Sequence, residues 1–255
     1  MKIPKSFDVI GDILLFQDFS KELIKKEKQI SNYLLKKYKN IKVVARKTKK
    51  YSGKYRLPKI KIIAGEKRKE TLHKENNCVF KLDIEKCYFT PRLANERLRI
   101  SKLIKNNESI LVLGSGMGVY PIVISKNSKA KEVYGIEINP IAHKYALENI
   151  KLNKTYNIIL LKGDIKKIIP KIKKKFDRII IPIPKNATFY LKSILKVSKK
   201  NTIIHLYDFS KEKDIPKSSI NKIKKYVKNF KALRHVKCGQ SSPRIYRVCI
   251  DFKLI

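Results

Sequence analysis

The fold is decided by the stretch Ile110-Leu111-Val112-Leu113-Gly114-Ser115-Gly116-Met117-Gly118, in which a short apolar run meets three alternating glycines. An apolar segment follows over 119–124, and then a second run, Val133-Tyr134-Gly135-Ile136-Glu137-Ile138, carries a carboxylate near its end. This order predicts a strand, a glycine turn, a helix and a second strand. A purely structural turn would use the same glycines, but Glu137 follows them by about twenty residues, the spacing of a site whose carboxylate accepts ribose hydroxyls.

Three ligands compete for such a site: NAD, FAD and S-adenosylmethionine. A third apolar run over 158–161 leads to Asp164, and an acidic residue there suits the exocyclic amine of adenine. Predicted strands at 233–238 and 245–252 are joined by a segment too short for a helical crossover, so they should be antiparallel. A classical NAD domain ends with parallel strands. The pattern therefore predicts an α/β class I (Rossmann-like) methyltransferase domain with S-adenosylmethionine as its cofactor.

The first hundred residues predict a small α+β domain. Strand material runs from Phe7 to Phe16 with a turn at Gly11-Asp12, and Ser20 predicts the start of a helix that reaches about Tyr38. Further strands are expected at 41–45, at 60–65 and from Val79. A basic loop is expected over 46–56, where Tyr51 and Tyr55 either stack on bases or are simply solvated. We therefore expect two domains, residues 1–99 and 100–255.

The charge balance points to a polyanionic partner. The chain has 61 Lys+Arg against 21 Asp+Glu, a formal net charge of +40. An AT-rich genome or heat adaptation would enrich lysine, but neither by itself removes acidic residues. Nucleic acid is the simplest partner. A membrane surface is the weaker alternative, because no basic helix shows an aromatic opposite face, and no apolar run is long enough for a transmembrane helix.

The four cysteines, Cys78, Cys87, Cys238 and Cys249, form no CxxC pair, so no metal site is expected. Their apolar neighbours indicate buried, reduced thiols in a cytoplasmic protein. No surplus apolar face is visible, which favours a monomer.

The segment Phe89-Thr90-Pro91-Arg92-Leu93-Ala94-Asn95-Glu96 carries candidate chemistry. Thr90-Pro91 predicts the start of a helix. Arg92 and Glu96 are four residues apart, so they should lie together at its first turn, either as a simple ion pair or as part of a site.

At these residues the chain resembles the archaeal and eukaryal tRNA (guanosine-37 N1)-methyltransferases, and more loosely their wyosine-pathway relatives. The resemblance covers most of the chain and rests on seven segments: 55–59, 70–76, 89–100, 135–140, 148–153, 203–207 and Ser242-Pro243-Arg244. In this family a Ser/Thr-Pro-Arg segment supplies an arginine to the active site, and Arg92 matches it. The related aminocarboxypropyl transferases have Gly-Asn there, so Arg92 favours methyl transfer.

The chain departs from the family pattern at three places. Val112 and Gly114 stand where the family usually has Asp and an aromatic residue, and Pro182-Ile183-Pro184 stands where it usually has Asn-Leu-Pro. Pro182 has neither a side-chain donor nor a backbone N–H to place a target base. The start of the chain also resembles the family's second domain, so the N-terminal domain that docks on the tRNA elbow in the resembling proteins is expected to be absent.

The resemblance implies methyl transfer to N1 of guanosine 37 in the anticodon loop of tRNA, and a wyosine precursor at that position is a further candidate substrate. Arg92 is expected to steady charge on O6 or to clamp a phosphate, and Glu96 either to take the N1 proton or to orient Arg92. An aminocarboxypropyl transferase and a non-catalytic tRNA-binding paralogue are the alternatives. The expected cofactor-binding residues are Gly114, Gly116, Gly118, Glu137, Ile138, Asp164 and Pro184, and the expected RNA contacts are Lys74, Arg92 and Arg244.

Overall fold

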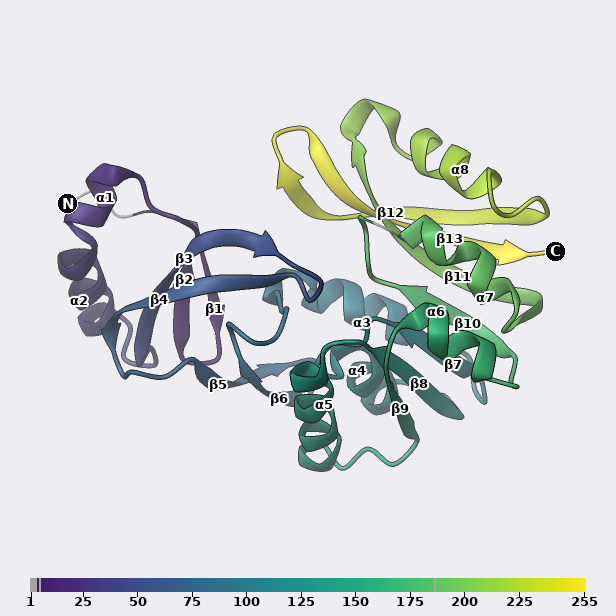
Figure 1. Ribbon diagram of the computed structural model, residues 1–255, viewed down its shortest axis with the longest axis horizontal. Helices are drawn as coiled ribbons and strands as arrows, with labels where there is room; N and C mark the ends of the chain where they lie inside the picture. The colour runs from purple at the N-terminus through teal and green to yellow at the C-terminus, as the bar shows by residue number, and fades with distance from the viewer. Residues whose placement is uncertain (1–3, 5, 186) are drawn as a thin grey trace.

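The computed structural model describes residue 4 and residues 6–185 and 187–255, and it combines a seven-stranded sheet with a smaller sheet near the N-terminus (Figure 1). The large sheet has the order β12-β13-β11-β10-β7-β8-β9. Its strands β7 to β11 are parallel where they pair, whereas β13 is antiparallel to both β11 and β12. The antiparallel end predicted from the sequence is therefore confirmed. The strands are β7 (Ser109–Leu113), β8 (Glu132–Glu137), β9 (Ile158–Lys162), β10 (Phe176–Ile181), β11 (Ser198–Lys211), β12 (Phe230–Ser242) and β13 (Ile245–Leu254).

Helices cover both faces of this sheet, which is why the inner strand β7 is a nearly continuous apolar run. One face packs on α3 (Ala94–Lys102) and α4 (Val119–Asn127) through Ile100, Tyr120 and Ile124. The other packs on α6 (Ile165–Ile168), α7 (Leu191–Leu195) and α8 (Lys217–Lys224). The helix α5 (Pro140–Leu152) lies against α4 and β9. Short 3₁₀ turns, η1 (Pro91–Leu93), η2 (Ile169–Lys171), η3 (Ala187–Tyr190) and η4 (Glu212–Asp214), complete the connections. The sequence also predicts a helix from about Asn186 to Val197; Asn186 itself lies outside the described residues, and η3 and α7 occupy most of the rest of this range.

The small sheet has the order β1-β2-β3-β4, formed by β1 (Phe7–Ile10), β2 (Ile13–Phe16), β3 (Val43–Ser52) and β4 (Leu57–Gly65). The predicted helix at 20–38 is divided into α1 (Lys21–Lys25) and α2 (Glu27–Lys37), which cover one face. The other face packs on β6 (Cys78–Asp83), the partner of β5 (Glu70–Glu75), and through it on α4. One apolar core thus joins the small sheet to the large domain.

The prediction of a basic loop over residues 46–56 is wrong for most of that range. β3 continues to Ser52 because its backbone pairs with β4, Arg46 with Lys61 and Lys47 with Ile60. The strand lacks the apolar alternation that would have revealed it, because charged residues occupy buried positions. Arg46 and Lys47 are both buried, and Arg46 is stabilised there by donating to Glu27 and Asp18. The tip of this hairpin therefore reaches the middle of the molecule (Figure 1).

Candidate active site

The carboxyl ends of four neighbouring parallel strands bring the predicted cofactor residues to one edge of the large sheet. Leu113 at the end of β7 pairs with Ile136, Glu137 at the end of β8 pairs with Lys162, and Ile180 of β10 pairs with Val112. The glycine turn, Glu137, Asp164 and the 182–184 loop follow these ends directly. This edge is where open α/β sheets bind their ligands.

The three glycines of the turn have left-handed backbones, with φ of 65°, 58° and 87°, but they serve different purposes. A side chain at Gly118 would meet Ile122 and Ala146, so this glycine allows α4 and α5 to pack. A side chain at Gly114 would come within 2.9 Å of Ile183 in the loop after β10. Gly116 faces open space, with nothing within 4 Å of its absent Cβ. The backbone at Gly116 is therefore open to close approach.

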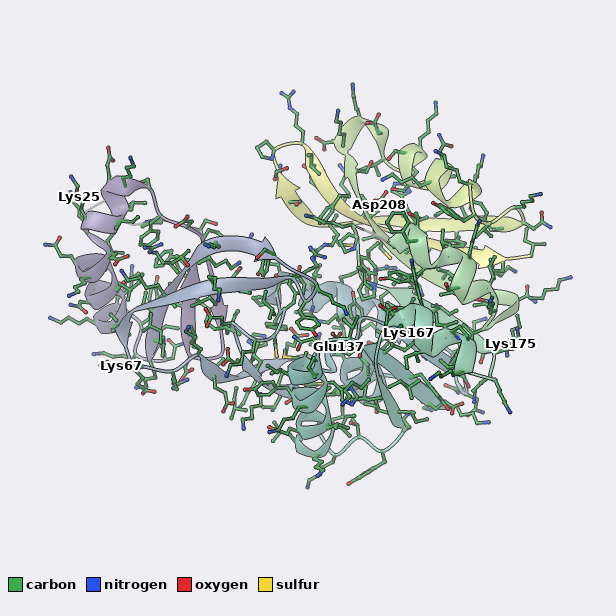
Figure 2. The ribbon with its side chains drawn as sticks, viewed as in Figure 1. Lys25, Lys67, Glu137, Lys167, Lys175 and Asp208 are labelled. Atoms are coloured by element: carbon green, nitrogen blue, oxygen red, sulfur yellow. The ribbon has the colours of Figure 1, made fainter. Side chains whose placement is uncertain are left out.

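Glu137 lies near the middle of the molecule, buried at the end of β8 (Figure 2). One carboxylate oxygen accepts the N–H of Gly116 at 2.7 Å, and the other accepts the N–H of Asn139 at 2.7 Å. Burial raises the pKa of Glu137 despite these bonds. Each oxygen retains a second lone pair, so the carboxylate can still accept two hydroxyls.

The remaining predicted cofactor residues surround this point. Asp164 is half-buried and caps α6 by accepting the N–H of Lys166 at 2.8 Å. Ile138 is half-buried directly after Glu137, and Pro184 is buried in the loop that approaches Gly114. Asn139 caps α5, accepting the N–H groups of Ile141 and Ala142. These residues fit an adenosine-bearing ligand: a carboxylate for the ribose, open backbone at Gly116 and an acidic group after the third strand.

A second group of side chains lies where the small sheet meets the large domain. The Tyr51 and Tyr88 rings meet edge to face at 5.0 Å, and the Arg56 guanidinium lies 5.2 Å from the centre of the Tyr88 ring. Arg247 donates to the Tyr88 hydroxyl at 3.3 Å and lies 5.5 Å from the ring of Phe209. We call Tyr51, Arg56, Tyr88, Phe209 and Arg247 the junction cluster.

The junction cluster is adjacent to the cofactor edge. Lys86, two residues before Tyr88, is bonded to the cofactor edge: the side chain of Asn139 donates to the Lys86 carbonyl at 2.9 Å. Tyr51 is half-buried in the junction, and this burial raises the pKa of its hydroxyl, with Tyr88 and Asp8 nearby raising it further. An aromatic ring bordered by two guanidinium groups is suited to stacking and hydrogen-bonding a nucleobase.

The expected pairing of Arg92 with Glu96 is wrong. Residues 91–93 form a 3₁₀ turn and α3 begins only at Ala94, so the two side chains diverge. Arg92 is about half exposed and its Nε donates to Asp8 at 2.6 Å, an acid 84 residues away in the sequence. Arg92 thus faces the small sheet beside the junction cluster, while Glu96 points into the large domain.

Glu96 belongs to a buried hydrogen-bond network. Both of its oxygens accept from Arg99 at 2.7 Å, and one also accepts the Tyr207 hydroxyl at 2.6 Å. Arg99 donates onward to Asp251 at 2.7 Å, and Asp251 accepts from His205 at 2.6 Å. We call Glu96, Arg99, Arg178, His205, Tyr207 and Asp251 the interior network.

Arg178 completes the interior network at its far end. It donates to His205 Nε2 at 2.8 Å and to both oxygens of Glu108. Nε2 therefore accepts while Nδ1 donates, which makes His205 a neutral ring, and burial lowers its pKa. His205, Cys249 and Asp251 bring potential ligand atoms within 4.8 Å of one another, but the adjacent guanidinium groups of Arg99 and Arg178 disfavour a cation there.

The predicted RNA contacts lie on the surface. Lys74 is exposed on β5 and lines a groove of 870 Å³ between this strand and the turn after β1, away from Glu137. Arg244 is exposed in the turn between β12 and β13. Lysines project from both parts of the molecule, as Lys25, Lys67 and Lys175 show in Figure 2. Within the part of the chain that the structure describes, no helix is long and apolar enough to span a bilayer.

Sequence reasoning missed Arg56, Tyr88 and Arg247 as functional candidates. Arg56 lies within the family-like segment 55–59, and Tyr88 directly precedes the segment 89–100, so the resemblance already pointed to the parts of the chain that contain them. Arg247 lies 159 residues from Tyr88 along the chain, and no local pattern connects the two.

Comparison with known proteins agrees with this geometry. Residues 71–235 match the family model described as the TRM5/TYW2 methyltransferase domain, and residues 1–68 match the TYW2 N-terminal domain. The chain belongs to the TRM5/TYW2 family. The predicted S-adenosylmethionine-dependent methyltransferase fold and the predicted family are thereby confirmed, while the exact domain division at residue 99 stays a prediction.

Family members with different activities resemble the chain over nearly its whole length. It is 36% identical to the tRNA (guanine(37)-N(1))-methyltransferase Trm5b of Pyrococcus abyssi, covering 99% of this chain and 76% of that protein. It is 33% identical to the tRNA (guanine(37)-N(1))/4-demethylwyosine(37)-methyltransferase Taw22 of Nanoarchaeum equitans, covering 98% and 100%. It is 30% identical to a tRNA(Phe) (4-demethylwyosine(37)-C(7)) aminocarboxypropyltransferase of Methanocaldococcus jannaschii, covering 97% of each.

Solved structures of the TRM5/TYW2 family share the fold. The crystal structure of Pyrococcus abyssi Trm5b superposes with a TM-score of 0.89 at 35% identity, covering 98% of this chain and 75% of that one. A complex of aTrm5 with tRNALeu superposes with a TM-score of 0.87 at 32% identity, covering 99% and 73%.

Proposed function

We propose that this protein transfers the methyl group of S-adenosylmethionine to N1 of guanosine 37 in the anticodon loop of tRNA. The observation that carries the proposal is the juxtaposition of the cofactor edge at Glu137 with the junction cluster and with Glu96. Relatives named for this reaction cover nearly the whole chain. S-adenosylmethionine would supply an electrophilic methyl group, and the residues of the chain would hold it and the base.

The cofactor edge and the junction cluster divide the binding work. Gly114, Gly116 and Gly118 shape the turn, Glu137 accepts the ribose hydroxyls, and Asp164 accepts the adenine amine, with Ile138 and Pro184 as apolar walls. A base splayed from the anticodon loop stacks on Tyr88, because loop bases leave their stack at low cost. Arg56 and Arg92 offer guanidinium groups to base oxygens and to the flanking phosphates.

Glu96 is the proposed acceptor of the N1 proton. Tyr207, which donates to Glu96, and Phe209, which contacts Arg247, are alternate residues of β11 and project from the same face. Alternate residues of a strand are about 6.6 Å apart. Glu96 therefore lies one such step from the junction cluster, with Arg99 holding its carboxylate in place.

The electrostatics of the chain suit a tRNA substrate. A net charge of +40 attracts a phosphate backbone, and Lys74 on β5 and Arg244 in the turn between β12 and β13 present exposed cations. We further propose a cytoplasmic monomer, which size-exclusion chromatography with light scattering would test.

A second candidate, favoured by Pro182, is a later transfer to a wyosine precursor at position 37. Pro182 removes a donor from the cofactor edge, so the base or the cofactor can sit differently there. Taw22, the bifunctional relative, and the aminocarboxypropyltransferase relative carry names for such steps.

The test is the nucleoside profile of tRNA incubated with the protein and S-adenosylmethionine. A G37 transcript should gain 1-methylguanosine, and a transcript with another base at position 37 should not. Product only on tRNA that already carries the wyosine precursor would move the function to the later step. Binding of both tRNAs with no product on either would favour a non-catalytic paralogue.

A further inference from the structure

Arg99 lies between two buried carboxylates. Its Nε and Nη2 donate to the two oxygens of Glu96 at 2.7 Å each, and its Nη1 and Nη2 donate to Asp251 at 2.7 Å and 3.4 Å. Glu96 and Asp251 are only 6% and 3% exposed, so water screens neither charge well. This group therefore carries one more negative charge than positive charge.

Proton transfer to Glu96 changes this charge balance. In the proposed reaction the N1 proton of guanine moves to Glu96 while N1 bonds to the methyl carbon, and the sulfur keeps the electron pair of the broken S–C bond. Glu96 is then neutral and no longer balances Arg99. A buried cation without a counter-charge is strongly destabilised, and this would oppose the transfer. Asp251 prevents that outcome, because Arg99 still has a second carboxylate at 2.7 Å.

Asp251 is held in its charged form by the rest of the interior network. Nδ1 of His205 donates to it at 2.6 Å, and the Arg178 guanidinium donates to Nε2 of the same ring at 2.8 Å. Although burial alone would raise it, bonds from His205 and Arg99 hold the pKa of Asp251 below its usual value. Asp251 therefore stays a carboxylate throughout the reaction.

Four neutral groups on the neighbouring elements complete the surroundings of Glu96. They are Tyr120 on α4, Tyr207 on β11, Cys238 on β12 and Cys249 on β13. Burial raises the pKa of each of them, so all four stay uncharged near neutral pH. Arg97, the next residue of α3, is balanced by its own carboxylate, Glu75, at 2.5 Å and 2.6 Å. The balance at Glu96 is thus set by Arg99 and Asp251.

We propose that Asp251 is the positioning residue that allows Glu96 to accept the N1 proton, an inference that rests on the proposed function. Before the reaction Asp251 shares Arg99 with Glu96, and afterwards it is the counter-charge that Arg99 retains. His205 and Arg178 hold it in that role. The interior network thus keeps Arg99 balanced in both protonation states of Glu96.

The test is the pH profile of single-turnover 1-methylguanosine formation on tRNA with G37. The wild-type rate should rise with pH to a plateau as Glu96 becomes available as a carboxylate. In Asp251→Asn the plateau should be about tenfold lower or more, and the rise should move about one pH unit lower, because protonating Glu96 now leaves Arg99 unbalanced. Asp208→Asn, which removes a buried acid of β11 paired with Lys222 outside the interior network, should keep the wild-type profile.

A second pair of variants repeats the comparison without the buried cation. Arg99→Gln retains the charge of Asp251, whereas Arg99→Gln/Asp251→Asn does not, and neither leaves an unbalanced cation when Glu96 is protonated. The rise should therefore lie at higher pH in Arg99→Gln than in the double variant, because a nearby negative charge favours the protonated carboxyl. The two pairs together form a double-mutant cycle.

The outcomes separate the inference from the proposed function. A lower plateau in Asp251→Asn with the rise at the wild-type pH would overturn the inference, because a residue that only stabilises the fold does not move the rise. If that variant does not fold, equal positions of the rise in the two Arg99→Gln variants would overturn it. A wild-type rate that is independent of pH would also do so. Failure of the wild type to form 1-methylguanosine at any pH would instead overturn the proposed function.

Discussion

The interior network and the junction cluster both contain arginine and tyrosine side chains, but the arginines of the two regions have different partners. In the interior network Arg99 and Arg178 each meet carboxylates, and nearly every polar atom has a partner. In the junction cluster Arg56 and Arg247 lie against aromatic rings, and Arg247 keeps a sheltered donor unused. Satisfied buried charges hold a structure in one arrangement, whereas unsatisfied donors beside aromatic rings are available for a ligand. We therefore infer that the interior network positions side chains, whereas the junction cluster recognises the substrate.

Glu96 sits where the two regions meet, so its substitution should have the largest effect. Replacing it with Gln keeps the shape but removes the proton acceptor, and we expect kcat to fall by about a hundred- to ten-thousandfold. The measurement is single-turnover formation of 1-methylguanosine, with tRNA binding measured in parallel. Tyr207→Phe, which removes one bond to Glu96 and leaves the carboxylate, is the matched control. An equal loss in the two variants would mean that Glu96 is only a member of the interior network.

Breaking the interior network at Asp251 should reduce stability more than any change in the junction cluster. Although burial alone would raise it, bonds from His205 and Arg99 hold the pKa of Asp251 below its usual value. Asp251→Asn should cost about 3–5 kcal/mol in the free energy of unfolding at neutral pH, because Arg99 loses one of its two buried counter-charges and His205 loses its carboxylate acceptor. The measurement is urea denaturation, with Asp214→Asn, which has no recorded ion pair, expected to change little.

The lowered pKa also sets the pH dependence. A carboxylate with a depressed folded-state pKa stabilises the fold above the unfolded pKa of about 3.9, and this contribution is lost as the pH falls through the folded value. The wild type should therefore lose stability on acidification below about pH 4, and Asp251→Asn should lose less over the same interval. Parallel acid profiles would show that Asp251 is not the group responsible.

Tyr88→Ala should show the reverse pattern, with little change in stability and a clear loss of function. One base stacked on an aromatic ring is worth about 1–3 kcal/mol, so kcat/KM should fall by about five- to 150-fold. Tyr88→Phe keeps the ring and should retain most of the activity. Tyr33→Ala, an exposed tyrosine on α2, is the control for a general loss of aromatic surface. A Tyr88→Phe variant as impaired as Tyr88→Ala would assign the function to the hydroxyl instead of the ring.

The sequence predicted what neighbouring residues determine and missed what distant residues determine. The glycine turn, Glu137 and the cap at Asn139 lie within one βαβ unit, where spacing along the chain translates directly into geometry. The strand over 46–52 was missed because its partner strand, and not an apolar pattern, makes it a strand. Arg92 and Glu96 were misjudged because acceptors and donors from β1 and β11 compete for them. The junction cluster joins four separate segments, and no spacing rule describes such a meeting.

The smallest effects are expected at the surface, where neither region lies. Lys74→Ala and Arg244→Ala should each weaken tRNA binding slightly. Each should also reduce the slope of log K against log salt by up to about one unit, because a variant with one phosphate contact fewer releases fewer counterions when it binds. Lys25→Ala, at the far end of the small domain (Figure 2), should leave the slope unchanged if tRNA does not reach α1. Equal slope changes in all three variants would indicate diffuse attraction by the whole basic surface. Specific recognition would then rest on the junction cluster alone, since its guanidinium groups would be the only cations whose removal changes the response to the base at position 37.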